Sequence, residues 1–240
     1  MEQYYNITGL TVKMDSYGRT VEQAEPYRCE PVESPDITIQ SMWETAKETH
    51  AEYYANVSDD IGEYLFTGFS FYKQLLNFGG FMLHSSAVVV DGKAYLFSAT
   101  SGTGKSTHTK LWLDLFGDQA YILNDDKPAL RLEDGTWYAY GTPWSGKHDI
   151  SVDARIPLGG IAMIHRGEEN TIRPFTGKEA ILELIRQVNR PKDMQFRIRL
   201  LELLDQLFAM VPIWYLECNM EPEAAIVSYE AMSGNKFKEI

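Results

Sequence analysis

Residues 99–107, ATSGTGKST, carry the residue types of a phosphate-binding loop, G-x-x-x-x-G-K-[ST], with Ala99 in the place of the first glycine. Such a loop directs backbone N–H groups at phosphate oxygens, and the following helix N-terminus adds positive potential. Lys105 would contact the β- and γ-phosphates, and the hydroxyl of Ser106 would bind Mg²⁺. The expected nucleotide-binding residues are Ser101, Gly102, Thr103, Gly104, Lys105, Ser106 and Thr107.

The alternative to a nucleotide loop is a glycine-rich turn with an exposed lysine. A pattern that allows Gly or Ala first would occur by chance in about 2% of chains this long. Here the match also follows an expected strand and opens an expected helix, which is the context that a phosphate loop needs. We therefore expect ATP and Mg²⁺ as ligands.

A hairpin is expected to lead into this loop. In HSSAVVVDGKAYLFS, residues 84–98, two β-rich runs are joined by Asp91-Gly92, a strong signal for a two-residue turn. That turn pairs Val90 with Lys93 and places His84 opposite Ala99. We expect His84 beside the mouth of the loop, the alternative being a capped or surface histidine.

Two adjacent carboxylates follow one helix later. The apolar run 121–123 ends in Asn124-Asp125-Asp126. A strand that delivers two carboxylates beside a phosphate loop suits Mg²⁺ binding and acceptance of a proton from a hydroxyl. The alternative is an Asn-Asp turn held by hydrogen bonds from side chain to backbone.

The flanking segments predict an α/β protein. Residues 1–60 are expected to form a β-rich extension with a long loop, and 61–240 the core of a single catalytic domain. Helices are expected over 64–78 and 106–117, two amphipathic helices thereafter, and a last helix from Glu221. One face of the first amphipathic helix would consist of Ile181, Leu184, Ile185 and Val188. One face of the second would consist of Phe196, Leu200, Leu203, Leu204 and Leu207. Further strands are expected at the two arms of 128–140, at LGGIAMI, at TIRPF and at IWYLE.

Bulk properties narrow the class of protein. The chain has 240 residues and a formal net charge of −12, which argues against a nucleic-acid partner. No apolar run is long enough to span a membrane, and the N-terminal residues do not resemble a secretory signal. Two cysteines in no metal-like spacing indicate a reduced, cytoplasmic protein.

The motifs in residues 80–165 resemble the catalytic domain of HPr kinase/phosphorylase. HSSAVVVDGKAYLFSATSGTGKST followed by ILNDD matches that family's histidine, its phosphate loop and its Asp-Asp pair, with 21 residues from His84 to Lys105. The resemblance implies the mixed-sheet α/β fold shared with PEP carboxykinase, in which a hairpin precedes the phosphate loop. The overall layout is similar to small HPr-kinase-like proteins that phosphorylate precursor peptides.

The resemblance also implies roles for single residues. Lys105 would contact phosphate, Ser106 and Asp125 would bind the metal, Asp126 would be the general base, and His84 would assist. Asp153-Ala154-Arg155 is similar to the family's E-x-R, with Asp153 in the place of Glu. This would give Asp153 a metal role and Arg155 a phosphate role.

The expected function is an ATP-dependent kinase that acts on a Ser or Thr hydroxyl of a protein or peptide. A small-molecule kinase and a non-catalytic nucleotide-binding regulator are the alternatives, and homo-oligomer formation stays open. In the loop 141–148, Trp144 would stack on nucleotide or peptide and Lys147 would contact phosphate, unless the loop is only surface. Arg190 is a candidate for an arginine finger, but the favoured alternative is that it belongs to a solvated basic turn. His50, His108, His148 and His165 have no ligand spacing, and none is expected to bind a metal.

Overall fold

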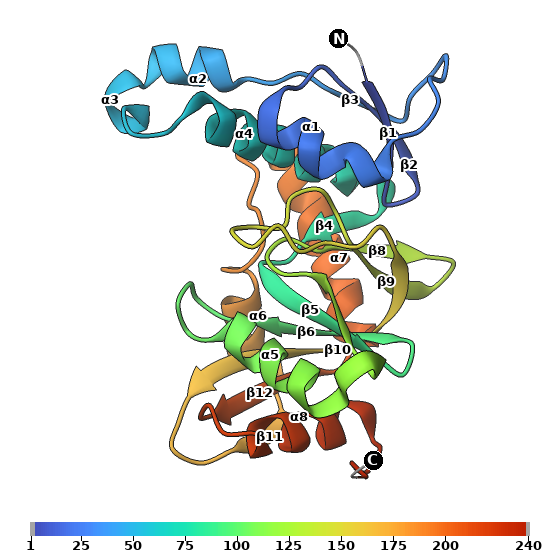
Figure 1. Ribbon diagram of the computed structural model, residues 1–240, viewed down its shortest axis with the longest axis vertical. Coiled ribbons are helices and arrows are strands. Elements are labelled where there is room, and N and C mark those ends of the chain that lie inside the picture. The colour runs from blue at the N-terminus through green and yellow to red at the C-terminus, as the bar shows by residue number, and fades with distance from the viewer. Residues whose placement is uncertain (1–2, 239–240) are drawn as a thin grey trace.

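Two layers of secondary structure make up residues 3–238, the part of the chain that the computed structural model describes. The upper layer in Figure 1 contains a small sheet and helices from the N-terminal third of the chain. The larger lower layer is a curled mixed sheet with helices packed on it. The expected α/β class with a mixed sheet is confirmed.

The strands are β1 (Gln3–Ile7), β2 (Leu10–Met14), β3 (Ile37–Ile39), β4 (Gly80–Met82), β5 (Ser85–Val90), β6 (Lys93–Ser98), β7 (Tyr121–Asn124), β8 (Ala129–Glu133), β9 (Thr136–Tyr140), β10 (Arg155–Arg166), β11 (Thr171–Pro174) and β12 (Ile213–Cys218). The α-helices are α1 (Gly18–Ala24), α2 (Trp43–Thr49), α3 (Ala51–Tyr54), α4 (Asp59–Leu75), α5 (Lys105–Phe116), α6 (Gly177–Leu184), α7 (Met194–Met210) and α8 (Glu223–Ser233). Short 3₁₀ turns cover Glu25–Tyr27, Leu76–Phe78 and Gly117–Gln119.

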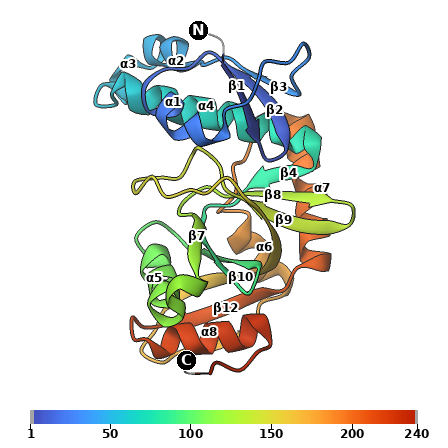
Figure 2. The ribbon, with the colours of Figure 1, turned by 45° about the vertical axis from the view of Figure 1, so that its right-hand side comes forward.

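The long strand β10 makes the lower sheet curl. The strand order is β4-β8-β9-β10-β6-β5-β7, and β12 pairs with both β10 and β11. The first residues of β10 pair antiparallel with β9, whereas later residues pair parallel with β6 and with β12. One strand thereby joins an antiparallel half to a parallel half, and Figure 2 shows the two halves turning around it.

The hairpin β5–β6 has the expected register. Asp91 and Gly92 both have positive φ, 53° and 69°, as a type I′ turn requires. Val90 pairs with Lys93 and Ser85 with Ser98, so His84 and Ala99 follow at the open end. The position expected for His84 at the entrance of the loop is confirmed.

Both faces of this hairpin are buried, because side chains alternate between them. Ala87, Val89, Ala94 and Leu96 pack into a cluster with residues of α6 and α7. Val88, Val90, Tyr95 and Phe97 pack into another with residues of α5 and α8. The hairpin is thus a rigid support for the loop that follows it.

The N-terminal residues contain more helix than the sequence indicates. The expected β-rich stretch 1–60 has the strands β1, β2 and β3, but also α1, α2, α3 and the start of α4. Its apolar strand residues pack on α4 and continue into Met82, Ala129, Tyr140 and Trp144, which belong to the rest of the chain. Residues 3–60 therefore share a hydrophobic core with the described residues that follow them.

The expected helix over 64–78 is present as α4 with a 3₁₀ turn, and Gly79 ends it with φ 74°. The buried face of α7 has the expected Leu200, Leu203, Leu204 and Leu207 inside, and Phe196 of the same face is partly buried. The prediction for the preceding helix is wrong in part. Helix α6 ends at Leu184, and Ile181 is 44% exposed because Ala180 and Leu184 occupy the buried side.

Among residues 3–238, every helix falls short of the length or apolarity needed to cross a bilayer.

A buried histidine connects α5 to the C-terminal elements. His108 is 3% exposed, its Nε2 lies 3.0 Å from Ser228 Oγ, and its Nδ1 lies 3.8 Å from Cys218 Sγ. Burial lowers the pKa of His108 from 6.5 to about 4, because the charged form would lose its hydration. His108 is therefore neutral in the folded protein at neutral pH.

This burial predicts a loss of stability in mild acid. Between pH 6.5 and about 4 the unfolded chain binds a proton at His108 that the folded chain does not, so the free energy of unfolding falls as the pH falls. The loss from this group should reach about 3 kcal/mol near pH 4. Urea unfolding of wild type and His108→Gln from pH 7.5 to 4 measures it. The variant should be less stable at pH 7.5, with a flatter pH dependence; identical slopes would contradict the prediction.

Candidate active site

The loop between β6 and α5 has a backbone that requires glycine. Gly102 and Gly104 have φ values of 79° and 127°, which side chains other than glycine rarely adopt. A Cβ added at either position would meet no atom within 4 Å, so the space in front of the loop is open. Helix α5 begins at Lys105 without a side-chain cap, and its first N–H groups are left for another acceptor.

A cavity of about 670 Å³ lies in front of this loop. Six segments of the chain form its wall: helix α1, helix α4, His84 before β5, the loop with the start of α5, residues 125–127 after β7, and the loop 141–148. The side chains and glycines that line it are Arg19, Ile61, Tyr64, Leu65, His84, Ser101, Gly102, Gly104, Lys105, Ser106, Thr107, Asp125, Asp126, Lys127, Gly146, Lys147 and His148.

The charges of this cavity oppose those of the chain. Its wall carries four cationic side chains, Arg19, Lys105, Lys127 and Lys147, against the two carboxylates of Asp125 and Asp126. The chain as a whole has a formal net charge of −12. A positive cavity in an acidic protein favours an anionic ligand at this place.

Lys105 is buried at the base of the cavity. Only 8% of it is exposed, and its Nζ donates to the carbonyl oxygen of Ala99 at 3.2 Å. Burial lowers the pKa of Lys105, although the nearby carboxylates of Asp126 and Asp125 oppose this effect. An anion in the cavity would offset the loss of hydration of the ammonium group.

Asp125 is held by hydroxyl groups from two other elements. Its Oδ1 accepts from Ser86 Oγ of β5 at 2.7 Å, and its Oδ2 accepts from Ser106 Oγ of α5 at 3.3 Å. The ring Nδ1 of His148 lies 2.7 Å from the same Oδ2. These contacts fix a buried carboxylate next to the hydroxyl of Ser106, so the two side chains that the sequence predicts as metal ligands lie together.

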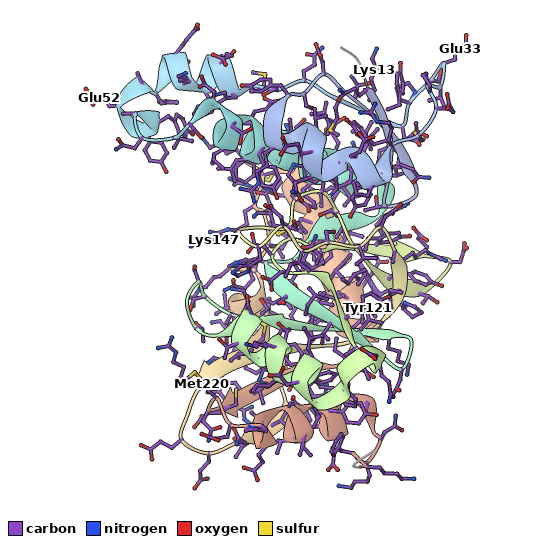
Figure 3. The ribbon with its side chains drawn as sticks, in the orientation of Figure 1. Lys13, Glu33, Glu52, Tyr121, Lys147 and Met220 are labelled. Carbon is purple, nitrogen blue, oxygen red and sulfur yellow. The ribbon has the colours of Figure 1, made fainter. Side chains whose placement is uncertain are left out.

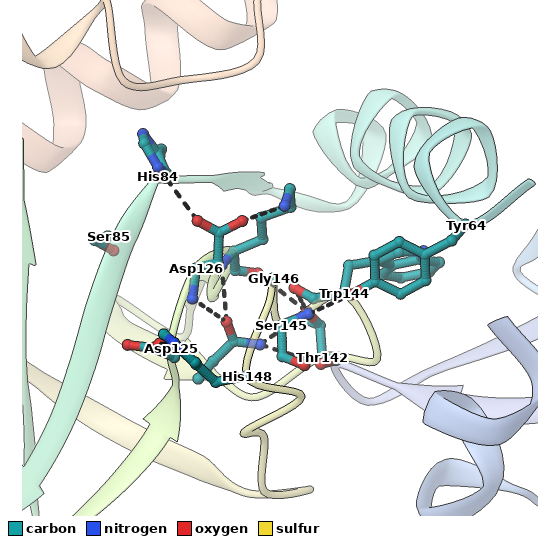
Figure 4. Close-up of polar contacts among 12 residues, drawn as sticks. Tyr64, His84, Ser85, Asp125, Asp126, Thr142, Trp144, Ser145, Gly146 and His148 are labelled. Atoms are coloured by element: carbon teal, nitrogen blue, oxygen red, sulfur yellow. Dashed lines mark hydrogen bonds and ion pairs between the residues drawn. The ribbon is translucent and has the colours of Figure 1, made fainter. Parts of the chain in front are cut away.

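Asp126 lies between two basic side chains (Figure 4). His84 Nε2 is 3.3 Å from Oδ1, and Lys127 Nζ contacts Oδ2. Burial would raise the pKa of Asp126, but the hydrogen bonds from His84 and Lys127 and their charges hold it well below its usual range. Asp126 is therefore ionised at neutral pH, and its side chain is held in one orientation toward the cavity.

His84 is itself fixed by a neighbouring segment. Its Nδ1 lies 3.1 Å from Gln187 Oε1, and its backbone N–H donates to Gln187 O at 2.8 Å. When protonated, the imidazole donates to Gln187 from one nitrogen and to Asp126 from the other. The segment after α6 thus sets the position of His84.

Asn124 forms the turn that the sequence offered as an alternative. Its side-chain oxygen accepts the backbone N–H groups of Asp126 and Lys127 at 3.0 and 2.8 Å. Its Nδ2 donates to Thr142 O at 3.1 Å. The turn and the carboxylate site are therefore one arrangement, because Asn124 supplies the turn and directs both carboxylates into the cavity.

The loop 141–148 reaches the cavity through its last residues only. Gly146, Lys147 and His148 line the wall, and the predicted contact of Lys147 with phosphate stays a prediction. The prediction that Trp144 stacks on a ligand is wrong. Trp144 is 1% exposed and stacks on Phe71 of α4, with ring centroids 4.9 Å apart, because this residue anchors the loop in the core.

Asp153 and Arg155 do not join this site. They line a different cavity of about 540 Å³, beside β8, β9 and the N-terminal strand β1. Arg155 Nε donates to Glu133 at 2.9 Å, and its guanidinium lies 3.6 Å from the ring centroid of Tyr138. The pairing of β10 with β9 places both residues there, so the metal role of Asp153 and the phosphate role of Arg155 receive no support from the geometry.

Several residues of the cavity had no signal in the sequence. Arg19 of α1 lies over the ring of Tyr64, 4.5 Å from its centroid, and donates to Gly146 O. Lys127 and His148 contact the two carboxylates, and Ser86 orients one of them. Arg190 does not line the cavity, and its predicted role stays untested.

Comparison with known proteins gives a distant structural similarity. No family model and no curated protein matches the sequence. The solved structure of the Hpr(Ser) kinase/phosphatase from Coxiella burnetii is similar with a TM-score of 0.37 and 11% sequence identity, over 64% of this chain and 95% of that chain.

The buried position of Trp144 predicts a structural role. Trp144→Ala should lower the free energy of unfolding by about 3–5 kcal/mol, because it leaves a cavity against Phe71 and Tyr72. Lys147→Ala in the same loop is the control and should change it by less than about 0.5 kcal/mol, since Lys147 is exposed. Urea unfolding measures both. Equal stability of the two variants would contradict the buried stacking of Trp144.

Proposed function

We propose that this protein is an ATP-dependent kinase that transfers the γ-phosphoryl group to a Ser or Thr hydroxyl of a protein or peptide. One observation carries the proposal. The glycine-containing loop with Lys105 shares a single cavity with a fixed, ionised carboxylate, Asp126, that also contacts a histidine and a lysine. Phosphoryl transfer needs cations around the phosphates and an acceptor for the hydroxyl proton, and it needs little else from the protein.

The loop and the start of α5 fit a triphosphate. The uncapped N–H groups at the start of α5 and the buried ammonium of Lys105 face the cavity, and the open space in front of Gly102 and Gly104 admits phosphate oxygens. Bound MgATP would supply the phosphoryl group and the metal that neutralises it. The further cations at Arg19, Lys127 and Lys147 suit the remaining charge.

The protein offers few ligands for a magnesium ion. Residues 3–238 contain no group of three or more His, Cys, Asp or Glu side chains placed to hold a metal. Ser106 Oγ and Asp125 Oδ2, 3.3 Å apart, form a pair of oxygen donors in the cavity. This fits Mg²⁺, which is commonly bound by one or two protein oxygens with phosphates and water completing the octahedron.

Asp126 is proposed to receive the hydrogen bond of the acceptor hydroxyl. Its low pKa keeps it ionised, so it orients a hydroxyl toward the phosphate as an acceptor. In a loose transition state the hydroxyl proton leaves late, when the oxygen has already become acidic, and a weakly basic carboxylate then suffices. His84 and Lys127 act as positioning residues that fix the carboxylate. A purely nucleotide-binding regulator has no need of this arrangement.

The carboxylate pair predicts two different variant phenotypes. Asp126→Asn keeps the size of the side chain but cannot accept a proton, so phosphoryl transfer should fall by about 10²–10⁴-fold while MgATP affinity stays within a few-fold. Asp125→Asn should instead raise the Mg²⁺ concentration needed for activity. Incorporation of ³²P from labelled ATP into a library of Ser-containing peptides measures transfer.

Asp118→Asn, an exposed change outside the cavity, is the matched control and should act like wild type. If Asp125→Asn and Asp126→Asn both transfer at the wild-type rate at every Mg²⁺ concentration, the pair is only a turn and the proposed chemistry is wrong.

A variant of Lys105 tests nucleotide binding at the phosphate loop without the need to know the acceptor. Lys105→Met removes the buried ammonium but keeps an unbranched side chain, so MgATP affinity should fall about tenfold or more and turnover should be lost. Calorimetry with MgATP measures the affinity, and Lys110→Met on the exposed side of α5 is the control. Unchanged affinity and activity in Lys105→Met would contradict nucleotide binding at this loop.

A further inference from the structure

A small pocket borders the catalytic cavity, the cavity in front of the phosphate loop, on the side of helix α4. Its volume is about 20 Å³. Tyr64, Leu65 and Lys127 line both the pocket and the catalytic cavity, so the two spaces are neighbours. The rest of its wall consists of Gly68, Phe69, Tyr72, Met82 and Trp144.

The polar groups of this wall are engaged outside the pocket. The hydroxyl of Tyr64 donates to Pro143 O at 3.3 Å. The hydroxyl of Tyr72 donates to Lys127 O at 2.5 Å, and the ring N–H of Trp144 donates to a threonine hydroxyl of α4 at 3.3 Å. The surface that faces the pocket is therefore ring and aliphatic carbon, which suits an apolar group.

The pocket lies beside the proposed acceptor carboxylate and apart from the phosphate loop. Lys127 follows Asp126 in the chain, and its Nζ contacts Asp126 Oδ2. The described lining of the pocket contains no residue of the loop 99–107, although this loop lines the catalytic cavity. In Figure 4, His84 and the ring of Tyr64 lie on opposite sides of Asp126. A hydroxyl bound at Asp126 therefore has the pocket next to it, toward α4.

The pocket is closed at one side and open at another. A Cβ added to Gly68 would lie 2.8 Å from the ring of Trp144, so α4 and this ring are in close contact. Phe69 is 49% exposed, so one side of the wall reaches solvent. Figure 3 shows Lys147, which lines the catalytic cavity, at the edge of the molecule between its upper and lower layers. A peptide can approach from this edge.

The volume of the pocket limits what it can hold. A space of about 20 Å³ is little more than a water-sized sphere, so it admits methyl groups and excludes an aromatic ring. Successive residues of an extended peptide are about 3.3 Å apart along the chain. The residue next to a bound hydroxyl is therefore the one that can place its side chain in a space beside Asp126.

We propose that the pocket receives a small apolar side chain, alanine or valine, of the residue next to the phosphorylated serine or threonine. The inference rests on the proposed function, because it assumes that a hydroxyl is phosphorylated beside Asp126. It adds the class of acceptor sequence, a hydroxyl with small apolar neighbours. An acidic neighbour, which the cations Arg19 and Lys147 would favour, is the alternative that the test decides.

The test uses serine peptides of the form Gly-Gly-X-Ser-X-Gly-Gly, which carry the same residue X on both sides. Incorporation of ³²P from labelled ATP gives kcat/KM for each peptide. With wild type, X = Val should exceed X = Gly by about tenfold, because the valine side chain leaves water. X = Asp should give no gain, since a carboxylate would lose its hydration in the pocket. X = Phe should give none because the ring does not fit.

Widening the pocket should change this preference. Phe69→Ala removes a half-exposed part of the wall and should raise the ratio of kcat/KM for X = Phe to that for X = Val by about tenfold. Phe66→Ala, the same substitution on α4 but outside the linings of both spaces, is the control and should leave the ratio unchanged. Far-UV circular dichroism checks folding. Met82→Ala widens the pocket from β4 and replaces Phe69→Ala if that variant does not fold.

The inference is overturned if wild type phosphorylates the Val and Gly peptides equally, or if the Asp peptide is the best acceptor. It is also overturned if the ratio stays unchanged in the widened variant, or if Phe66→Ala raises it as much. Each of these outcomes includes phosphoryl transfer and leaves the proposed function in place. Wild type that phosphorylates none of the peptides would contradict the proposed function itself.

Discussion

The buried carboxylate of Asp125 is the constraint on which the site depends. A buried charge must be hydrogen-bonded, and Asp125 meets this requirement through Ser86 of β5, Ser106 at the start of α5, and His148 of the loop 141–148. Three segments far apart in the sequence are thereby held at one point. Ser86 also contacts Thr109 Oγ1 at 3.0 Å, so a second turn of α5 is tied to the hairpin.

The hairpin β5–β6 makes this point rigid. Because side chains on both of its faces are buried, one against α6 and α7 and the other against α5 and α8, its ends cannot shift without disturbing two clusters. His84 precedes one strand and Ala99 follows the other. The two buried clusters on the faces of the hairpin thus place the histidine, the loop and the carboxylates. A few polar contacts then set the orientation of these side chains.

The upper layer closes the cavity from the opposite side. Arg19 and Tyr64 contact each other and the backbone of the loop 143–146, while Trp144 of the same loop is buried against α4. The layer that had no resemblance in sequence to the kinase family therefore forms a wall of the cavity. Arg19 and Tyr64 line the cavity together with Asp126, so an acceptor in the proposed reaction would meet the N-terminal residues.

Local sequence patterns determined the elements closest to the chemistry. The Asp91-Gly92 turn set the register of the hairpin, the glycines of the loop indicated its backbone, and the run 121–126 indicated a strand that ends in carboxylates. These predictions succeeded because each depends on the dihedral preferences of a few consecutive residues. The buried face of α7 could be predicted from its spacing of leucines, because the helical repeat places them on one side of the helix.

Only the tertiary structure decided which distant residues meet these elements. Asp153 and Arg155 follow the loop 141–148 closely in sequence, yet the pairing of β10 with β9 carries them to another cavity. Arg19, Lys127 and His148 reach the site although no pattern marks them, and Trp144 leaves it for the core. Such outcomes depend on strand order and on the packing of one layer against another. These are contacts between residues many positions apart, and a local pattern of residue types contains no information about them.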